Sequence, residues 1–247
     1  MVYILWGMLI IAIMVFIAIF TAIIPGYILH LIGLGKVADS LIFWHAALIS
    51  NIGLWLSGTR VHVSGNLASI RKRIKNGESF CFVSNHTSIL DIILMLGKLG
   101  AKAGFVTKRE LVYVPLINAI IASTHSVFID RKNLRRSVAS IKKATENIRK
   151  GHSMVIFPEG TRSKTGEIGF FKHGSFRMAT ESGAEIVPIT VKGLRGQFEE
   201  RRRFFQTGDC YLHVGNPVKP VSPADREAVS AMITSIENEI KETYAKL

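Results

Sequence analysis

The chain has 247 residues, enough for one large domain or one domain with an appendage, and its formal net charge is +13 at pH 7. Before Arg60 only Lys36 and Asp39 are charged, and they cancel, so the excess positive charge lies in the remainder. A basic domain can bind nucleic acid, anionic lipid or an acidic protein. The uncharged N-terminus and the lack of a zinc-ligand or RNA-binding signature argue against nucleic acid, so an anionic membrane surface is the expected partner.

The N-terminal segment is apolar enough to enter a membrane. Residues 2–24 form an uncharged apolar run, which would be about 34 Å long as a helix. No basic residue precedes the run and no cleavage site follows it, so we do not expect a secretory signal. Pro25-Gly26 should break or kink this helix, and a weakly amphipathic helix is expected from Val37 to Leu56.

Two membrane arrangements fit this segment: one span followed by an interfacial helix, or a two-helix hairpin in one leaflet. We favour the hairpin, because it holds the following domain close to the lipid. Basic residues follow the apolar run and none precede it, so the positive-inside bias predicts a cell-membrane protein whose large domain lies on the cytoplasmic face. The expected domains are a membrane-associated two-helix segment, residues 1–58, and an α/β domain, residues 59–247.

The remainder of the chain alternates strand and helix patterns. Strands are expected at Val61–Val63, Phe80–Val83, Gly104–Val106, Val127–Ile129, Met154–Phe157, Ile186–Val191 and Tyr211–Val214. Helices are expected at Leu67–Lys75, Asp91–Leu99 and Leu134–Ile148, and after Ser222–Asp225. This alternation predicts an α/β fold with a mixed, mostly parallel sheet and flanking helices. Cys81 and Cys210 lie in strand patterns and are expected to be buried and reduced.

The first motif with chemical content is Asn85–Asp91. His86 follows a strand, at the place where open α/β sheets build their sites. Asp91 should lie in the first turn of the next helix and reach back to His86. Three polar residues could cap that helix: Asn85, Thr87 and Ser88. The pair is a serine-hydrolase triad without its serine, in which Asp91 would fix the His86 tautomer and His86 would accept a proton from a substrate hydroxyl.

The second motif is Phe157–Ser163, which follows another expected strand. Arg162 offers a forked donor for phosphate, and Gly160 allows close approach of the backbone to a ligand. Both motifs can therefore open onto one crevice. A helix-capping aspartate and a core histidine remain the alternative interpretation of the first motif taken alone.

Together these motifs resemble the glycerolipid acyltransferase family, most closely the 1-acyl-glycerol-3-phosphate (lysophosphatidic acid) acyltransferases. Four blocks within residues 80–190 carry the resemblance: Asn85–Asp91; Lys108–Leu111 with Pro115 and Phe128–Arg131; Phe157–Ser163 with Phe171–Gly174; and Ile186–Ile189. The family often has glycine where this chain has Asn118 and His125.

The resemblance implies transfer of a fatty acyl group to the sn-2 hydroxyl of lysophosphatidic acid, which gives phosphatidic acid. The donor would be a thioester of acyl carrier protein or coenzyme A. His86 would be the general base, paired with Asp91, and would later protonate the leaving thiolate without an acyl-enzyme. The residues implied to hold the glycerol phosphate are Glu159, Gly160, Thr161 and Arg162, with Lys108 as a second cation. No metal or redox cofactor is implied.

Other interpretations remain open at this point. The acceptor could be glycerol 3-phosphate or a lysophospholipid, the enzyme could be a thioester hydrolase, or the domain could be a non-catalytic basic module that coats anionic membranes. The segment Phe198–Phe205 mixes basic and aromatic residues and suits either a loop on anionic headgroups or a solvated loop. Four histidines lack ligand spacing and are expected to be structural: His125, His152, His173 and His213.

Overall fold

The computed structural model describes residues 13, 16–113, 117–200 and 206–247. Its strands are β1 (Thr59–Gly65), β2 (Cys81–Ser84), β3 (Ala103–Lys108), β4 (Val127–Ile129), β5 (Ser153–Ile156), β6 (Ile186–Lys192) and β7 (Gly208–Val214). They form one sheet in the order β1-β7-β6-β2-β5-β3-β4. Each strand overlaps a segment that the sequence pattern predicts.

The sheet is mixed and mostly parallel, which confirms the predicted fold class. Only β6 and β7 pair antiparallel, and the other neighbouring strands within the described residues pair in parallel. The central strands β6, β2, β5 and β3 therefore run in the same direction. Their carboxyl ends lie along one edge of the sheet, where α/β folds build their sites.

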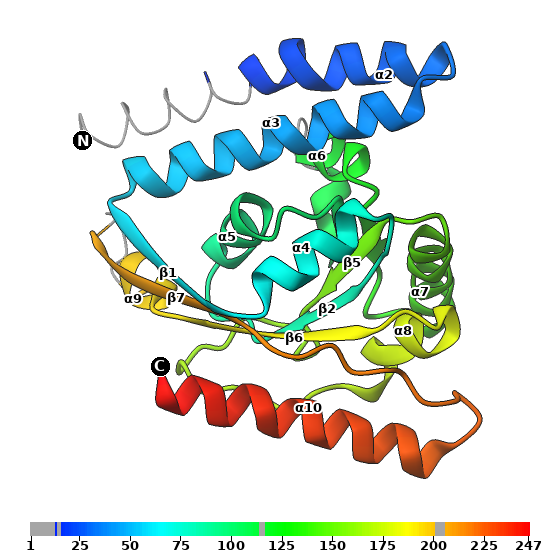
Figure 1. Ribbon diagram of the computed structural model, residues 1–247, viewed down its shortest axis with the longest axis vertical. Helices are drawn as coiled ribbons and strands as arrows, with labels where there is room; N and C mark the ends of the chain where they lie inside the picture. Colours follow the sequence, from blue (N-terminus) through cyan, green and yellow to red (C-terminus); the bar gives the residue numbers. More distant parts are fainter. Residues whose placement is uncertain (1–12, 14–15, 114–116, 201–205) are drawn as a thin grey trace.

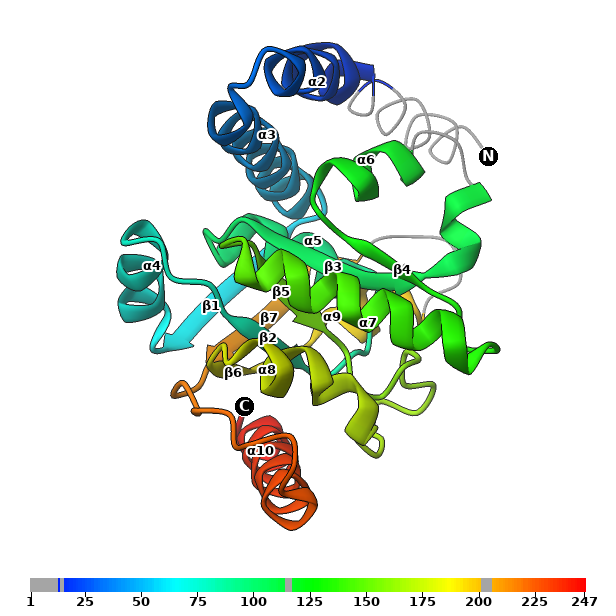
Figure 2. The ribbon, with the colours of Figure 1, turned by 90° about the vertical axis from the view of Figure 1, so that its right-hand side faces the viewer.

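Helices cover both faces of the sheet, as Figures 1 and 2 show. The longer ones are α4 (Leu67–Lys75), α5 (Leu90–Lys98), α7 (Leu134–Arg149) and α10 (Arg226–Lys246). Shorter helical segments are η2 (Arg109–Tyr113), α6 (Ile117–Ser123), η3 (His173–Phe176), α8 (Arg177–Ser182) and α9 (Leu194–Phe198). The first two long helices, α4 and α5, cover one face, and α7, α8 and α10 cover the other.

Alternate residues of the central strands build two hydrophobic cores. Phe82 and Val155 face the cluster that includes α4 and α5. Cys81 and Met154, one position earlier in each strand, face the cluster that includes α7, α8 and α10. This explains why both strands read as continuous apolar runs, which is typical of strands buried on both faces. Cys81 is a free, buried thiol, as is Cys210 on β7.

Two N-terminal helices, α2 (Ile24–Leu31) and α3 (Gly35–Leu56), pack against each other beside the domain (Figure 1). The backbone stays helical through Pro25 and Gly26, so of the break or kink expected there, the break does not occur. Pro25 lies in the first turn of α2, after the π-helical segment η1 (Ile19–Ile23), and a first-turn proline is well tolerated. The chain reverses instead at Gly33, whose φ of 82° suits glycine.

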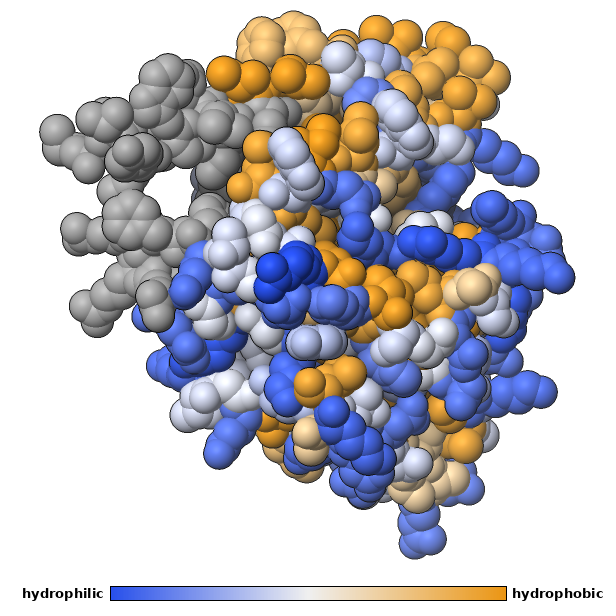
Figure 3. All heavy atoms as spheres, turned by 60° about the vertical axis from the view of Figure 1, so that its left-hand side comes forward, coloured by the Kyte–Doolittle hydropathy of each residue, from blue (hydrophilic) through white to orange (hydrophobic). Residues whose placement is uncertain are grey.

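The helix α3 has one face on the domain and one face exposed. Asn51 on α3 donates a hydrogen bond to the carbonyl of Gly97 at the end of α5, at 2.9 Å. On the other face, Trp44 is 62% exposed and Trp55 is 77% exposed. Figure 3 shows hydrophobic residues gathered over these N-terminal helices. Within the described residues, α3 alone is long and apolar enough to cross a membrane, judged by length and composition. The predicted apolar helix of residues 2–24 lies mostly outside the described residues.

Candidate active site

His86 lies two residues after the end of β2, on the loop that leads into α5. Its Nδ1 lies 2.9 Å from Oδ2 of Asp91, the contact that the sequence predicts. The ring stacks on Phe157 with centroids 4.0 Å apart, and its side chain is 15% exposed. Among the described residues, Nε2 has no hydrogen-bond partner. The imidazole is thus held in one orientation with one nitrogen free.

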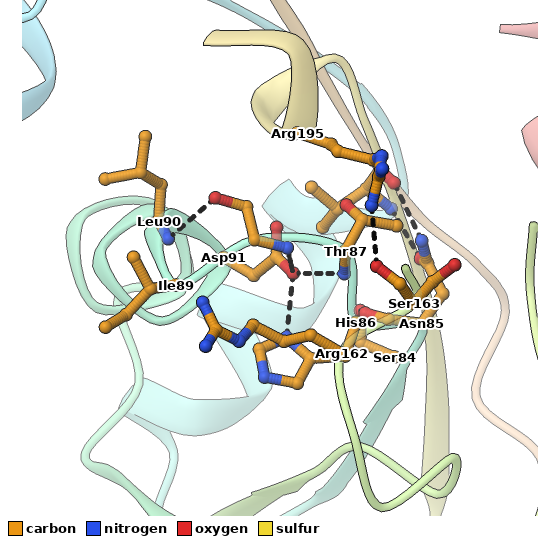
Figure 4. A network of polar contacts seen from close by, with 12 residues as sticks. Ser84, Asn85, His86, Thr87, Ile89, Leu90, Asp91, Arg162, Ser163 and Arg195 are labelled. Atoms are coloured by element: carbon orange, nitrogen blue, oxygen red, sulfur yellow. Dashed lines mark hydrogen bonds and ion pairs between the residues drawn. The ribbon is translucent and has the colours of Figure 1, made fainter. Parts of the chain in front are cut away.

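Asp91 is fully buried and gathers three donors on one oxygen. Its Oδ2 accepts the Nδ1 contact from His86 and the backbone N–H groups of Thr87 at 2.8 Å and Ser88 at 2.9 Å (Figure 4). Burial raises the pKa of Asp91, and the bond to His86 and the two amides oppose that rise. Its other oxygen, Oδ1, is buried without a partner among the described residues. A poorly solvated carboxylate of this kind gains stability when the neighbouring imidazole becomes positive.

The polar residues around the pair have different roles from those expected. The sequence suggests Asn85 as a helix cap, but its amide bonds to the backbone N–H and C=O of Val191 on β6, at 2.9 and 2.8 Å. The residue at the N-cap of α5 is Ile89, which has no side-chain cap, while Ser88 Oγ accepts the N–H of Leu90, the first residue of the helix, at 3.1 Å. Asp91 accepts the N–H groups of Thr87 and Ser88, which precede the helix. The side-chain oxygen of Thr87 has no partner among the residues described. The expected capping role is therefore wrong for Asn85 and for the Thr87 side chain.

The second motif follows β5 and is joined to the first by backbone contacts. Glu159 is buried, and its Oε1 accepts the N–H of His86 at 2.7 Å while its Oε2 accepts the N–H of Gly169 at 2.9 Å. Burial raises the pKa of Glu159, although these two amides oppose the rise. The N–H of Ser163 also donates to the carbonyl of His86 at 2.8 Å. The two motifs thus form one unit.

The positive groups of the second motif lie on its exposed side. Arg162 is 48% exposed, and its Nη1 lies 3.2 Å from Oε1 of Glu199. Gly160 has a φ of 76°, and a Cβ at that position would lie 2.7 Å from Nζ of Lys172. The positive φ favours glycine at this position, and the amine of Lys172 lies close to its backbone. Thr161 is exposed on the same loop.

Lys108 lies at the carboxyl end of β3, two strands from β2 in the sheet order. It is exposed, and its Nζ lies 3.1 Å from Oε1 of Glu110. The structure therefore places Lys108 on the same edge of the sheet as His86 but in an ion pair of its own. Pro115, part of the same sequence block, lies outside the described residues, as do residues 201–205 of the basic and aromatic segment.

Sequence reasoning missed two site neighbours. Lys172 contacts Gly160 although it lies 12 positions later, and it belongs to the block Phe171–Gly174 that follows the second motif. Glu199 accepts the N–H of Ile89 at 2.8 Å as well as the contact from Arg162. The block could have pointed to Lys172, but no local pattern marks Glu199, whose partners are far away in the sequence.

Within the described residues, a group of possible metal ligands occurs away from this site, where Asp39, His125 and His152 meet. The sequence suggested purely structural roles for both histidines because their spacing is not that of a metal motif. The fold brings them together from separate loops.

A histidine–aspartate pair at the carboxyl edge of an α/β sheet, joined to a basic loop, defines a candidate proton-transfer site, and no described serine, threonine or cysteine side chain is hydrogen-bonded to its imidazole. A family model described as "Acyltransferase" matches residues 60–192, more than half of the chain. The chain belongs to this acyltransferase family.

Individual proteins of known name are also similar to this chain. The chain is 29% identical over 163 residues to a 1-acyl-sn-glycerol-3-phosphate acyltransferase of Borreliella burgdorferi, and 32% identical over 176 residues to a probable one of Mycoplasma pneumoniae. These matches cover 66% of this chain and 63% and 65% of the relatives, so the chain spans slightly less than two-thirds of each. The crystal structure of the 1-acyl-sn-glycerophosphate acyltransferase PlsC from Thermotoga maritima matches with a TM-score of 0.75 and 26% identity, covering 96% of this chain and 95% of that one.

Proposed function

We propose that this chain is a 1-acyl-sn-glycerol-3-phosphate acyltransferase, which transfers a fatty acyl group from a thioester to the sn-2 hydroxyl of lysophosphatidic acid. The observation that carries the proposal is the pair of His86 and Asp91, 2.9 Å apart, in a chain of the acyltransferase family. The names of the relatives supply the acceptor. The product is phosphatidic acid, and the reaction serves phospholipid synthesis.

In this mechanism, Nε2 of His86 removes the proton from the acceptor hydroxyl as its oxygen attacks the thioester carbonyl. Asp91 stabilises the imidazolium that forms. The tetrahedral intermediate then expels the thiolate, which takes the proton back from His86. The C–S bond breaks, an ester C–O bond forms, and His86 returns to its neutral state. A backbone N–H is the proposed donor to the oxyanion.

The phosphate of the acceptor would bind at the basic loop after β5. Arg162 is exposed and can exchange its contact with Glu199 for a bidentate contact with phosphate. Gly160, Thr161 and Lys172 would line the same place, and Lys108 would add charge from the next loop. Glu159 already has both oxygens engaged by backbone amides, so its part in the proposal is to fix the loop.

The site would work at a membrane surface. The support is the apolar exposed face of the N-terminal helices, whose large exposed residues include Tyr27, Leu31, Trp44, Leu48, Ile52 and Trp55. The packing of α3 on α5 supports a monotopic arrangement, with the helix pair in one leaflet of the cell membrane. The cytoplasmic leaflet, which carries anionic lipid, would then face the basic domain.

An acceptor panel with purified protein tests the proposal. Lysophosphatidic acid, glycerol 3-phosphate and a neutral lysophospholipid are each supplied with an acyl-carrier-protein thioester and with a coenzyme A thioester. We expect phosphatidic acid from lysophosphatidic acid, detected by mass spectrometry, and the more active donor identifies the carrier. Preference for another acceptor would overturn the substrate assignment, and release of free fatty acid without any acceptor would instead indicate a hydrolase.

A further inference from the structure

Four side chains of types that can bind metal ions, one aspartate and three histidines, lie together at the sheet edge opposite His86. His30 lies in the last turn of α2 and Asp39 lies on α3, whereas His125 is two residues before β4 and His152 directly precedes β5. These two histidines are therefore at the amino ends of their strands. The four-residue β5 separates His152 from the catalytic edge by about 13 Å at 3.3 Å per residue. The cluster is thus independent of the proposed acyl-transfer site.

The four side chains are centred on the carboxylate of Asp39. Its Oδ1 lies 2.7 Å from Nε2 of His125 and 3.2 Å from Nε2 of His30, and its Oδ2 lies 4.0 Å from Nδ1 of His152. The ligand atoms of Asp39, His125 and His152 all lie within 4.8 Å of one another. Around a tetrahedral zinc ion, with bonds of about 2.0–2.1 Å, neighbouring ligand atoms are about 3.3 Å apart. The distances of 2.7, 3.2 and 4.0 Å between Asp39 oxygens and histidine nitrogens are therefore shorter and longer than the spacing around zinc, and small side-chain movements would bring them to it.

Hydrogen bonds within the cluster do not explain two features of His152, the environment of its Nδ1 and the position of its ring. Nδ1 of His152 is buried and has no hydrogen-bond partner among the described residues, although it faces Asp39. The ring of His152 stacks on that of His125 with centroids 3.7 Å apart, so both present nitrogens to the same carboxylate. A buried nitrogen without a partner is costly, and a metal ion would satisfy it.

The backbone at His125 strengthens this argument. Its φ of 55° makes it the only non-glycine residue with positive φ within the described part of the chain. Such a conformation favours glycine, and strained residues of this kind cluster at ligand sites. The peptide is held in place by Asn147, whose side-chain amide donates to the His125 carbonyl at 2.7 Å. In this backbone conformation, the imidazole of His125 contacts the carboxylate of Asp39.

We propose that Asp39, His125 and His152, with His30 as the fourth ligand, bind one divalent transition-metal ion, of which zinc suits the ligands best. Three imidazoles and one carboxylate are the borderline nitrogen and oxygen donors that zinc prefers, and four protein ligands make a closed, structural site. Binding removes the ring proton that His125 shares with Asp39 and leaves each imidazole neutral.

The proposed ion would join the N-terminal helix pair to the domain. Two ligands come from α2 and α3, and two come from the segments that lead into β4 and β5. The middle and end of α3 already pack on α5, with Leu54 in the hydrophobic core, and Lys102 Nζ donates to Ser40 Oγ at 2.8 Å nearer its start. A metal ion held by His30 and Asp39 would add a further link and would fix how α2 and the start of α3 lie relative to the domain.

The test uses the full chain without a histidine tag, purified in detergent, stripped with a chelator and then given zinc. We expect one zinc ion per chain by elemental analysis after gel filtration, a higher unfolding temperature, and slower hydrogen exchange in α2 and α3. Asp39→Asn and His152→Ala should weaken zinc binding at least about tenfold. Cobalt in place of zinc should show the visible absorption of a tetrahedral site in the parent chain but not in Asp39→Asn or His152→Ala.

Two further variants keep the test decisive. His125→Gly removes a ligand while the glycine accepts the positive φ, so this variant should fold and yet fail to bind zinc. His213→Ala removes a histidine that bonds Ser64 far from the cluster, so it should bind zinc like the parent. Absence of stoichiometric zinc in the parent, or equal zinc in the parent and in His125→Gly, would overturn the proposal.

Discussion

The carboxylate of Glu159 accepts the backbone N–H of His86 at 2.7 Å, which joins the loop after β5 to the loop after β2. The residues are 73 positions apart, and the return bond from Ser163 N–H to the His86 carbonyl makes the link double. The proposed general base and the proposed phosphate loop are therefore positioned by each other. A substitution in one loop should therefore change the position of the residues in the other.

Glu159→Gln tests this link through its response to pH. Burial raises the pKa of Glu159 above its ordinary value of 4.5, despite opposing bonds from two amides. The folded protein then holds a proton that the unfolded chain has released, so this carboxyl contributes less stability as pH rises above 4.5. We expect Glu159→Gln to cost about 1–3 kcal/mol at pH 5, because one amide loses its acceptor, and to cost less at pH 7.

Urea unfolding of the detergent-solubilised protein at both pH values measures the difference. Glu146→Gln, an exposed substitution on α7, controls for the loss of one negative charge. A cost that grows between pH 5 and pH 7 would mean that the amides, rather than burial, dominate the energetics of Glu159.

Removal of the proposed base is the second prediction. His86→Ala should lower kcat by about 10²–10⁴-fold, the usual contribution of general base catalysis. Product formation from lysophosphatidic acid, followed by mass spectrometry, measures it, with His213→Ala as the control. Full turnover in His86→Ala would exclude this residue as the base.

Asp91→Asn tests whether the negative charge of Asp91 is needed for activity in addition to its hydrogen bond with His86. All three donors use Oδ2 of Asp91, while Oδ1 has no partner among the described residues. An asparagine can therefore place its carbonyl oxygen toward the donors and keep the loop folded. It cannot stabilise the imidazolium as an anion does, so we expect kcat to fall by about 10²-fold or more. Activity equal to the parent, with the fold retained, would show that the negative charge is not needed.

The sequence predicted those features that depend on neighbours in the chain. The strands around Phe82 and Val155 were predicted because burial on both faces demands continuous apolar residues. The contact between His86 and Asp91 was predicted because one helical turn spans it. The short helices α6, α8 and α9 were not, since five to seven residues are too few to show a helical period.

Features that depend on distant segments could not be predicted in the same way. Asn85 looked like a cap, but it bridges to Val191, 106 positions away. His125 and His152 lacked metal-ligand spacing because the sheet, rather than a local motif, brings them to Asp39. Glu199 was not predicted as a site neighbour because its partners, Ile89 and Arg162, are also far away in the sequence. Polar side chains without a periodic partner take their roles from topology, which a single sequence does not specify.

Arg162→Ala is expected to raise KM for the phosphorylated acceptor. A bond to a charged group contributes about 1.5–3 kcal/mol, which corresponds to roughly a 10- to 100-fold change. Steady-state kinetics against lysophosphatidic acid measures it, and Arg177→Ala, which removes an exposed arginine paired with Glu181 on α8, is the matched control. Arg162→Lys should restore only part of the affinity, because lysine lacks the bidentate fork. An unchanged KM in Arg162→Ala would remove Arg162 from the phosphate site.

The exposed face of α3 should determine membrane attachment. Replacing Trp44, Leu48 or Trp55 by serine removes apolar surface that would enter the lipid, at about 1.5–3 kcal/mol for each side chain. Each substitution should therefore weaken binding to anionic liposomes at least about tenfold in a flotation assay. Leu134→Ser, which removes an equally exposed apolar residue from α7, should bind like the parent.

The same helix pair allows the topology to be tested with a single thiol. Cys81 and Cys210 are buried, and burial raises the pKa of both thiols to about 12, so neither should react with a maleimide at neutral pH. A cysteine in place of Ile32, an exposed residue in the turn between α2 and α3, is then the reactive site. If the pair lies in one leaflet, an impermeant maleimide should not label Ile32→Cys from the side of the membrane opposite the domain. Labelling from that side in sealed vesicles would show that α3 crosses the bilayer, and the packing of α3 on α5 would have to open for it to do so.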